Sequence, residues 1–416
     1  MSVKILHFAD AHIDAYSGGR IDTEHNGFSF HTVDFLKALD EIVDTAVSEN
    51  VQLVLFAGDT YRNAVPAPTF QREWQKRIIR LSQAEIPVLL IPGNHDISNN
   101  PFKASALQEL DTLRVPYLHV ASKGVQLFTP QELNGVPLQV IAVPWMPTIL
   151  SAARDKANKK TPEERAAEME EAIVRSVQRE IGKSDSSLPL ILLAHYAVQG
   201  CTYPSGQEAQ SGREVTLSRS LVCDPAFSYT ALGHIHLFQD LNEGQQPPAV
   251  YPGSIERVDY GEAKEEKGFI IAEVENHHTE YSFRKLHTRR MYNLQYEAKD
   301  PETLQQDLLD LLPSPEKAQD AMIRLSVSYP HAFESKINER ELRKSMEGAL
   351  DFQLRRKPIY ETRMRIQSED ISSLTPKDLL AAYCEITKTS DSEKEALCRL
   401  AGEIFHETET AFQKDL

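Results

Sequence analysis

The chain has 416 residues, of which 41% are hydrophobic and 25% are charged, ordinary values for a soluble globular protein of two or three domains. No apolar run is long enough for a signal peptide or a membrane-spanning helix, so we expect no membrane partner. The four cysteines form no CxxC pair, which favours reduced thiols and a cytoplasmic location. The net charge of −16 would repel polyanions, so a nucleic-acid substrate would require bound metal ions, local basic clusters or a basic partner.

Short apolar runs alternate with amphipathic segments through about residue 200, and this alternation predicts an α/β core with right-handed crossovers. Short, mainly apolar runs without alternation are typical of strands buried on both faces, and they lie at 4–9, 52–57, 87–92, 189–194 and 229–232. Helices are predicted at 31–50, 70–85, 102–113 and 161–182. The last of these begins with Thr-Pro and has a glutamate three residues after the threonine, a helix-start signature. Further strands, interpreted as mainly antiparallel, are predicted at 137–144, 248–254, 268–275 and 279–286.

A residue that could ligate a metal ion follows each of the five buried runs. Because the carboxyl ends of parallel strands meet at one edge of a sheet, we expect these side chains to gather in one crevice. A single histidine or aspartate at a strand end is more often a cap, a turn former or a satisfied core group, but coincidence does not explain five such segments. Seven ligands are too many for one ion and suit two ions that share a carboxylate; they are Asp10, His12, Asp59, Asn94, His195, His234 and His236.

From about residue 289 the pattern changes to a compact βαβαβ module. Its predicted strands lie at 290–298, 321–329 and 358–367, and its predicted helices at 301–312 and 335–350. Two further helices, joined by a polar turn, are predicted at 375–387 and 392–412. The second carries an apolar stripe that includes Leu400, Ile404 and Phe405. This stripe either packs on the body of the chain or docks on a partner.

Several of these segments resemble the motifs of the calcineurin-like metallophosphoesterases: D-x-H at 10–12, G-D at 58–59, G-N-H-D at 93–96, a lone histidine after a strand, and G-H-x-H at 233–236. The opening KILHFADAHID resembles the SbcD family of DNA-repair nucleases within that superfamily. The resemblance implies an α/β fold of two facing β-sheets flanked by helices, followed by a small α+β capping domain and a C-terminal helical hairpin. It implies a nuclease domain at 1–286, a capping and DNA-binding domain at 287–367, and an ATPase-docking tail at 368–416.

The resemblance also divides the ligands between two divalent metal ions. One set is Asp10, His12, Asp59 and His236, and the other is Asp59, Asn94, His195 and His234. Asp59 is then the shared carboxylate. Mixed imidazole and carboxylate ligation suits manganese, iron or zinc, and the family favours manganese. His95 is implied as the donor of a proton to the leaving oxygen, with Asp96 orienting it, although Asp96 could also close its own turn.

Some basic residues are candidates for contacts with a DNA backbone. Arg62 follows the G-D motif where relatives have a histidine that assists exonuclease action. A permanently charged arginine cannot shuttle protons but could clamp a phosphate, so the balance of exonuclease to endonuclease activity stays open. The other candidates lie in short basic runs, which are more often solvated faces than DNA contacts; they are Arg289, Arg290, Arg355, Arg356 and Lys357.

By resemblance, the favoured function is a DNA exonuclease and endonuclease that works as a dimer with an SbcC-like coiled-coil ATPase in DNA repair. The apolar stripe of the tail would then grip this ATPase. The alternative is a stand-alone metallophosphoesterase that acts on nucleotides, cyclic nucleotides or phosphoproteins, since the metal ligands are common to both classes. Members with small substrates usually end soon after G-H-x-H, which favours the nuclease. A non-catalytic scaffold would have lost ligands, and this sequence has lost none.

Overall fold

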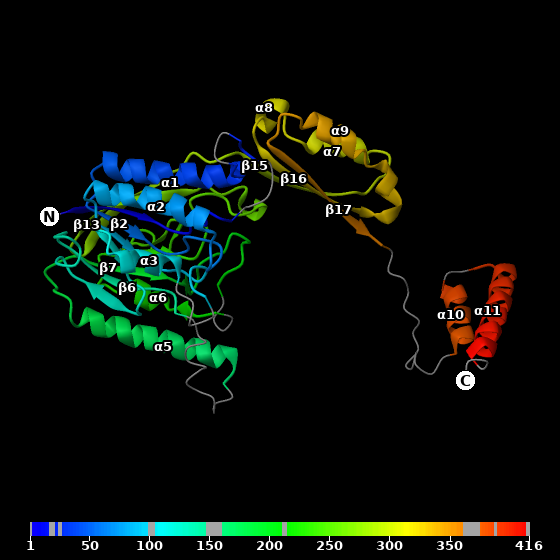
Figure 1. The fold of residues 1–416 in the computed structure, drawn as a ribbon, viewed down its shortest axis with the longest axis horizontal. Helices are drawn as coiled ribbons and strands as arrows, with labels where there is room; N and C mark the ends of the chain where they lie inside the picture. Colours follow the sequence, from blue (N-terminus) through cyan, green and yellow to red (C-terminus); the bar gives the residue numbers. More distant parts are fainter. Residues whose placement is uncertain are drawn as a thin grey trace. The chain divides into compact units, whose positions relative to one another are not determined.

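The computed structural model describes residues 2–15, 21–23, 27–98, 105–146, 160–209, 214–360, 375–386 and 389–412. The chain forms two compact units. The first comprises Met1–Gln295, Asp307–Ser326 and Glu339–Arg355, and the second comprises Tyr296–Gln306, Val327–Asn338 and Arg356–Leu416. The first unit contains two six-stranded sheets with helices on their outer faces (Figure 1).

The first sheet has the strand order β14-β13-β1-β2-β3-β4. The strands from β1 to β4 are parallel, and β13 pairs antiparallel with β1 and β14. Their bounds are β1 (Val3–Phe8), β2 (Leu53–Phe56), β3 (Val88–Leu90), β4 (Leu118–Val120), β13 (Gly268–Glu275) and β14 (His278–Lys285). The helices between these strands are α1 (Phe30–Ser48), α2 (Pro68–Gln83) and α3 (Ala106–Leu113). The alternation of strand and helix predicted for this half is therefore confirmed.

The second sheet has the order β11-β12-β10-β7-β6-β5. Its strands are β5 (Gln126–Phe128), β6 (Gln139–Val143), β7 (Leu190–His195), β10 (Tyr229–Gly233), β11 (Gln239–Asp240) and β12 (Ala249–Tyr251). The short strands β8 (Ala197–Val198) and β9 (Thr216–Leu217) form a separate pair, and helix α6 (Arg219–Val222) and the 3-10 turn η1 (Tyr260–Glu262) lie in the connections.

Two of the strands interpreted as mainly antiparallel have one antiparallel and one parallel neighbour, since β6 pairs antiparallel with β5, and β12 with β11. β6 is parallel to β7, and β12 is parallel to β10. For β6 the reason is the crossover helix α5 (Pro162–Ile181), which returns the chain in the same direction. That helix starts at the predicted signature: Thr161 caps the backbone of Glu164, and the Glu164 carboxylate accepts the Thr161 N–H.

The two sheets and the helices on their outer faces form four layers, and three apolar clusters fill the spaces between these layers. Figure 1 shows α1 and α2 on one side and α5 on the other. Alternate side chains of each strand point to opposite faces, so every sheet has an inner and an outer apolar face. Between the sheets lie Ile5, Leu55, Leu89, Val140, Leu193 and Ala231. Under α1 and α2 lie Phe8 and Phe56, against which Trp74 of α2 packs, and under α5 lie Ile141, Leu192 and Leu232. The predicted two-sheet fold flanked by helices is confirmed.

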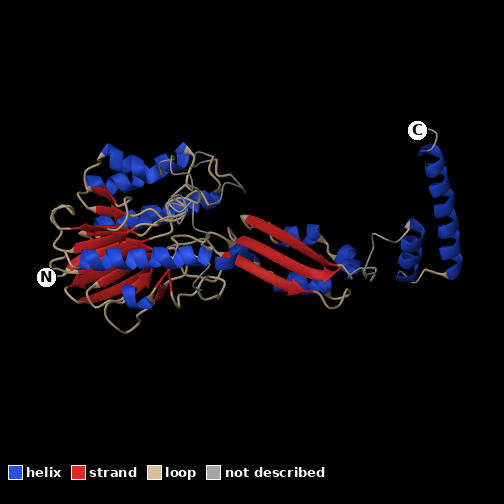
Figure 2. Cartoon of the chain, turned by 90° about the horizontal axis from the view of Figure 1, so that it is seen from below, coloured by secondary structure: helices blue, strands red, loops and turns tan. Residues whose placement is uncertain are grey.

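A three-stranded sheet with the order β15-β16-β17 follows the sandwich along the chain (Figure 2). Its elements are β15 (Met291–Glu297), α7 (Leu304–Leu311), α8 (Pro315–Ala318), β16 (Met322–Pro330), η2 (His331–Lys336), α9 (Glu339–Ser345) and β17 (Asp351–Ile359). The βαβαβ pattern is present, but β17 begins at Asp351, before the strand predicted at 358–367, and overlaps that prediction only up to its end at Ile359. Residues 361–374 lie outside the described part. The basic run of residues 355–357 is therefore part of a strand rather than the segment before it.

The C-terminal segment forms the expected helix pair, α10 (Pro376–Ile386) and α11 (Asp391–Phe412). Cys384 is buried between them, whereas Leu397, Leu400 and Ile404 are 44%, 55% and 54% exposed. Nothing is described of the Phe405 side chain, which the predicted stripe includes. None of the described helices combines the length and apolar character that crossing a bilayer requires.

Candidate metal centre

The carboxyl ends of five strands bring the seven predicted ligands to one place. Each ligand lies at or just after β1, β2, β3, β7 or β10. Asp10, His12, Asp59 and His195 are at most 2% exposed. Two sets have ligand atoms within 4.8 Å of one another: Asp10, His12 and His236, and Asp10, Asp59 and His195. Carboxylates and imidazoles are common ligands of divalent metal ions, and these side chains are close enough to share one.

The Asp59 carboxylate lies between two of the histidines. Its Oδ2 is 3.6 Å from Nε2 of His12 and 3.4 Å from Nε2 of His195. On the first side, Nε2 of His236 lies 3.1 Å from Nε2 of His12 and 4.0 Å from Oδ1 of Asp10. This position between the two groups of histidines fits Asp59 as a carboxylate that two ions could share.

The remaining ligands gather on the other side of Asp59. Oδ1 of Asn94 lies 3.1 Å from Nε2 of His195 and 2.9 Å from Nδ1 of His234. The Asp10 carboxylate accepts the backbone N–H of His234 at 3.0 Å. Asp10 also belongs to both sets of neighbouring ligand atoms, whereas the resemblance placed it only in the set with His12 and His236. The structure thus brings the seven predicted ligands together, and their division between two ions stays a prediction.

At four of the seven predicted ligands the backbone adopts a left-handed conformation, which the strands before them do not require. Asp10, His12, Asp59 and His234 have φ values of 51°, 37°, 59° and 96°, in the left-handed region that L residues seldom adopt. Such conformations persist only where the surroundings enforce them, and they cluster at functional sites. Four of the seven predicted ligands share this feature.

Glycines make room for the ligands. A Cβ at Gly58 would lie 2.3 Å from Nδ1 of His195, and a Cβ at Gly93 would lie 2.1 Å from Oδ1 of Asp59. A Cβ at Gly233 would lie 2.0 Å from the Ala57 carbonyl, which itself accepts a hydrogen bond of 2.6 Å from Nδ1 of His195. The G-D, G-N-H-D and G-H-x-H motifs therefore need their glycines for close approach of the chain to the ligands.

Electrostatic coupling inside the cluster is strong. Burial disfavours charge on Asp59 and His195, but the attraction between them outweighs it, lowers the pKa of Asp59 well below its usual range and raises the pKa of His195 to about 9. Burial lowers the pKa of His12 to about 3, which keeps that imidazole neutral. Without a cation, the Asp59 charge is therefore balanced by a protonated His195, which would have to release its proton to bind a metal ion, whereas His12 is already neutral.

Comparison with known proteins identifies the family of this core. Residues 3–238 match the calcineurin-like phosphoesterases. The chain belongs to this family.

The chain is also similar to individual proteins of this kind. It is 26% identical over 344 residues to the DNA double-strand break repair protein Mre11 of Archaeoglobus fulgidus, with 78% of this chain and 69% of that protein covered. It is 23% identical over 279 residues to the SbcD component of the nuclease SbcCD of Staphylococcus epidermidis, covering 66% of this chain and 67% of the relative. It is also 23% identical over 289 residues to the uncharacterized metallophosphoesterase YhaO of Bacillus subtilis, covering 68% and 60%.

His95 of this phosphoesterase lies beside the ligands, and its side chain is exposed. Its ring packs edge-on against the His12 ring, with 5.2 Å between centroids. Nδ1 donates to the Arg62 carbonyl at 2.9 Å, which leaves Nε2 for a substrate. The buried Asp96 carboxylate instead accepts N–H groups of Thr60 and Gly93, both at 3.0 Å. The orienting partner of His95 is therefore the Arg62 carbonyl, and Asp96 holds the loop, the alternative role expected for it.

The basic candidates have different surroundings. Arg289 is paired with Asp34 through contacts of 2.5 and 2.8 Å, so its guanidinium is engaged inside the protein rather than available to a phosphate. Arg356 is paired with Glu334 at 2.7 Å, and Arg290 donates to the Glu316 carbonyl at 3.1 Å. The remaining three are exposed: Arg62, Arg355 and Lys357. The Arg62 guanidinium donates to the Ala15 carbonyl at 2.9 Å.

Sequence reasoning missed the partners of the outer histidine nitrogens. Nδ1 of His236 lies 2.7 Å from Glu262, and Nε2 of His234 lies 3.1 Å from Glu214. Trp145 stacks beside the His234 ring, with 5.8 Å between centroids. None of these residues belongs to a recognisable motif, and only the folded chain brings them to the histidines.

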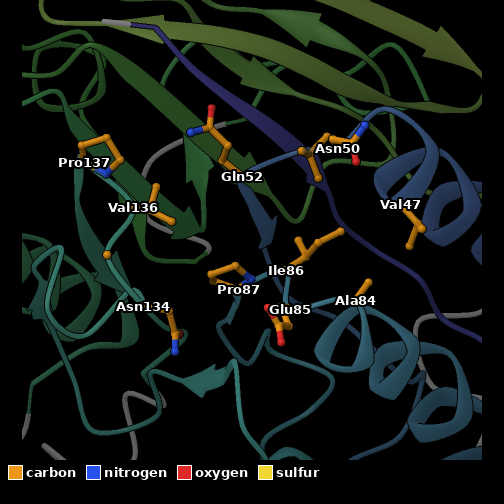
Figure 3. Close-up of a pocket in the computed structure, with 12 residues that line it drawn as sticks. Val47, Asn50, Gln52, Ala84, Glu85, Ile86, Pro87, Asn134, Val136 and Pro137 are labelled. Carbon is orange, nitrogen blue, oxygen red and sulfur yellow. The ribbon is translucent and has the colours of Figure 1, made fainter.

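A separate cavity of about 480 Å³ lies at the other edge of the sheets (Figure 3). Gln52 and Pro87, which line it, come immediately before β2 and β3, at the amino ends of these strands. In α/β sheets the reactive crevice lies at the carboxyl ends. The lining also contains no histidine and a single carboxylate, that of Glu85. We therefore place the candidate active site at the ligand cluster and not at this cavity.

Proposed function

We propose that this protein is a metal-dependent DNA nuclease that cleaves phosphodiester bonds, with both exonuclease and endonuclease action, and works with a coiled-coil ATPase in DNA repair. The observation that carries the proposal is the chain beyond the phosphoesterase core. The similarity to archaeal Mre11 covers 78% of this chain, more than the 3–238 segment holds, so it extends past the core. A phosphoesterase of small substrates needs neither the βαβαβ module nor the helix pair.

The chemistry would rest on two divalent ions, with manganese as our choice, held by the seven residues of the cluster. Bound ions would supply a nucleophile at neutral pH and neutralise charge on the attacked phosphate. Asp59 would be the carboxylate shared by both ions, and its Oδ1 also accepts the His95 N–H at 2.9 Å. Because Nδ1 donates its hydrogen to the Arg62 carbonyl, His95 would act as the acid in its doubly protonated form, and its Nε2–H would give the proton to the leaving oxygen of the DNA strand.

We assign roles to the two segments beyond the phosphoesterase core from the residues that they expose. Residues 287–367 would be the capping domain, with Arg355 and Lys357 as contacts to the DNA backbone. Residues 368–416 would dock on the ATPase through the exposed Leu397, Leu400 and Ile404. We also propose that the protein is a homodimer in the cytoplasm. A basic partner or bound metal would offset the net charge of −16, which otherwise disfavours DNA binding.

The test is hydrolysis by the purified full chain with added manganese. We expect nicking or degradation of linear and hairpin DNA, binding that weakens as salt rises, and faster cleavage when the ATPase and ATP are added. Asp59→Ala should lose both ions and nearly all activity, whereas Asp111→Ala, an exposed surface change, should lose neither. Robust hydrolysis of cyclic nucleotides or phosphoproteins without any action on DNA would support the stand-alone phosphoesterase instead.

A further inference from the structure

Both histidines of the G-H-x-H motif have a carboxylate on the ring nitrogen that faces away from the ligand cluster. Nδ1 of His236 lies 2.7 Å from Oε1 of Glu262, and Nε2 of His234 lies 3.1 Å from Oε2 of Glu214. A carboxylate in this place fixes the tautomer and the orientation of a metal-binding imidazole. In each ring the bond leaves the other nitrogen, Nε2 of His236 and Nδ1 of His234, for the cluster. The two carboxylates differ sharply in their surroundings.

Glu262 is held in a closed, buried network. Its Oε2 lies 2.7 Å from Nζ of Lys267, a side chain with no exposed surface. Nζ of Lys267 also lies 2.7 Å from Oε2 of Glu265 and 2.9 Å from the His236 carbonyl. An ammonium group has three donors, and here each one has an acceptor. The Val258 N–H donates to Glu262 as well, at 3.0 Å.

The charge of this network favours a cation at His236. Glu262 and Glu265 carry two negative charges, and Lys267 offsets one of them. The remaining negative charge lies in a buried region, where uncompensated charge is costly and electrostatic attraction is strong. A cation on the His236 ring would compensate it. Because Lys267 also binds the His236 backbone, the network fixes the ring and the main chain of that ligand together.

Glu214 has a looser setting. Its side chain is 31% exposed, and its second oxygen accepts a hydrogen bond from the Tyr203 hydroxyl. Within the described part of the chain, no lysine or arginine forms an ion pair with it. Tyr203 lies in the irregular connection between β8 and β9, not in a strand or helix of the sandwich. Solvent therefore screens the charge of Glu214, and its position depends on one loop.

We propose that Glu262 and Glu214 are positioning residues of unequal strength, so that the ion on His236 is bound tightly and the ion on His234 is bound loosely and exchanges. This inference rests on the proposed dinuclear site but not on DNA as the substrate.

The experiment is a titration of the metal-free full chain with manganese, followed by calorimetry and electron paramagnetic resonance. We expect two dissociation constants in the unaltered protein. Glu262→Gln should raise the smaller constant by about 10–100-fold, the usual effect of losing an outer carboxylate. Glu214→Gln should raise the larger constant by a similar factor and leave the smaller one unchanged. Tyr203→Phe should shift the same constant as Glu214→Gln, but less.

Two controls keep the result interpretable. Glu266→Gln removes an equal charge from an exposed residue paired with Lys285, and it should change neither constant. If Glu262→Gln lowers the melting temperature of the metal-free protein, Ser254→Ala provides a milder change, because the single hydrogen of that hydroxyl is shared between the Glu256 carbonyl at 2.9 Å and Oε2 of Glu262 at 3.3 Å. Equal constants in the unaltered protein, or both glutamate variants shifting the same constant, would overturn the inference. A protein that binds two ions in this order but cleaves no DNA would overturn only the proposed function.

Discussion

The backbone N–H of His95 donates a hydrogen bond of 2.9 Å to Oδ1 of Asp59. This bond engages one carboxylate oxygen with the G-N-H-D loop and leaves Oδ2 to face the histidine ligands. It also fixes the His95 backbone beside the cluster while its imidazole stays exposed and is bonded to a carbonyl rather than to another ligand. The two residues are thus linked through the main chain, and a change of the His95 side chain leaves that link intact.

From this arrangement we predict that His95→Gln separates catalysis from metal binding. The backbone bond to Asp59 remains in the variant, so both ions should stay bound. Cleavage should slow by roughly 10²–10⁴-fold, the range for loss of general acid–base assistance. Metal content measured on the same sample as the cleavage rate checks both parts. Loss of an ion would mean that the imidazole is a ligand, contrary to our assignment.

The sequence was sufficient to predict the ligand cluster because each ligand follows a strand that is apolar on both faces, and parallel strands present their carboxyl ends together. It was not sufficient for Glu214, Glu262 and Lys267, which lie 20 to 31 residues from the histidines they contact and follow no pattern. The parallel pairing of β6 with β7 and the start of β17 at Asp351 were also missed. Strand direction depends on the crossover that α5 makes, and β17 is half-exposed, so its apolar pattern is weak.

A second prediction concerns the glycine that precedes Asp59. Gly58 has φ +94°, and a Cβ there would lie 2.3 Å from Nδ1 of the buried His195 ring. Gly124 has φ +90° with nothing within 4 Å of its Cβ position, so it is a matched control for backbone strain alone. Alanine at either position should cost about 1–2 kcal/mol of unfolding free energy through the left-handed backbone. Only Gly58→Ala should also displace His195 and release metal; equal metal content in the two variants would contradict this.

The third prediction separates structural from DNA-binding arginines. Arg289→Gln leaves the Asp34 carboxylate, whose side chain is 8% exposed, without its ion-pair partner, so it should lower the unfolding free energy by about 3 kcal/mol. Arg355→Gln changes an exposed residue and should leave stability within about 0.5 kcal/mol. If Arg355 contacts a phosphate, its loss should reduce the slope of log affinity against log salt by about 0.9. Chemical denaturation and DNA binding at several salt concentrations test the pair, and an unchanged salt slope would remove Arg355 from the DNA contacts.

The last prediction concerns the apolar stripe of α11. Leu400 and Ile404 are 55% and 54% exposed in the described structure, so Leu400→Glu with Ile404→Glu places the new charges in solvent and should leave the melting temperature unchanged. If the stripe docks on a coiled coil, the same double variant should abolish binding to an SbcC-like ATPase, because a carboxylate buried in an apolar interface is costly. Unassisted cleavage of DNA and metal content should be normal. Leu113→Glu, which alters a leucine that is 67% exposed on α3, is the control for a charge placed elsewhere on the surface. A marked fall in melting temperature would instead mean that the stripe packs on this chain, and normal melting with normal ATPase binding would exclude both roles.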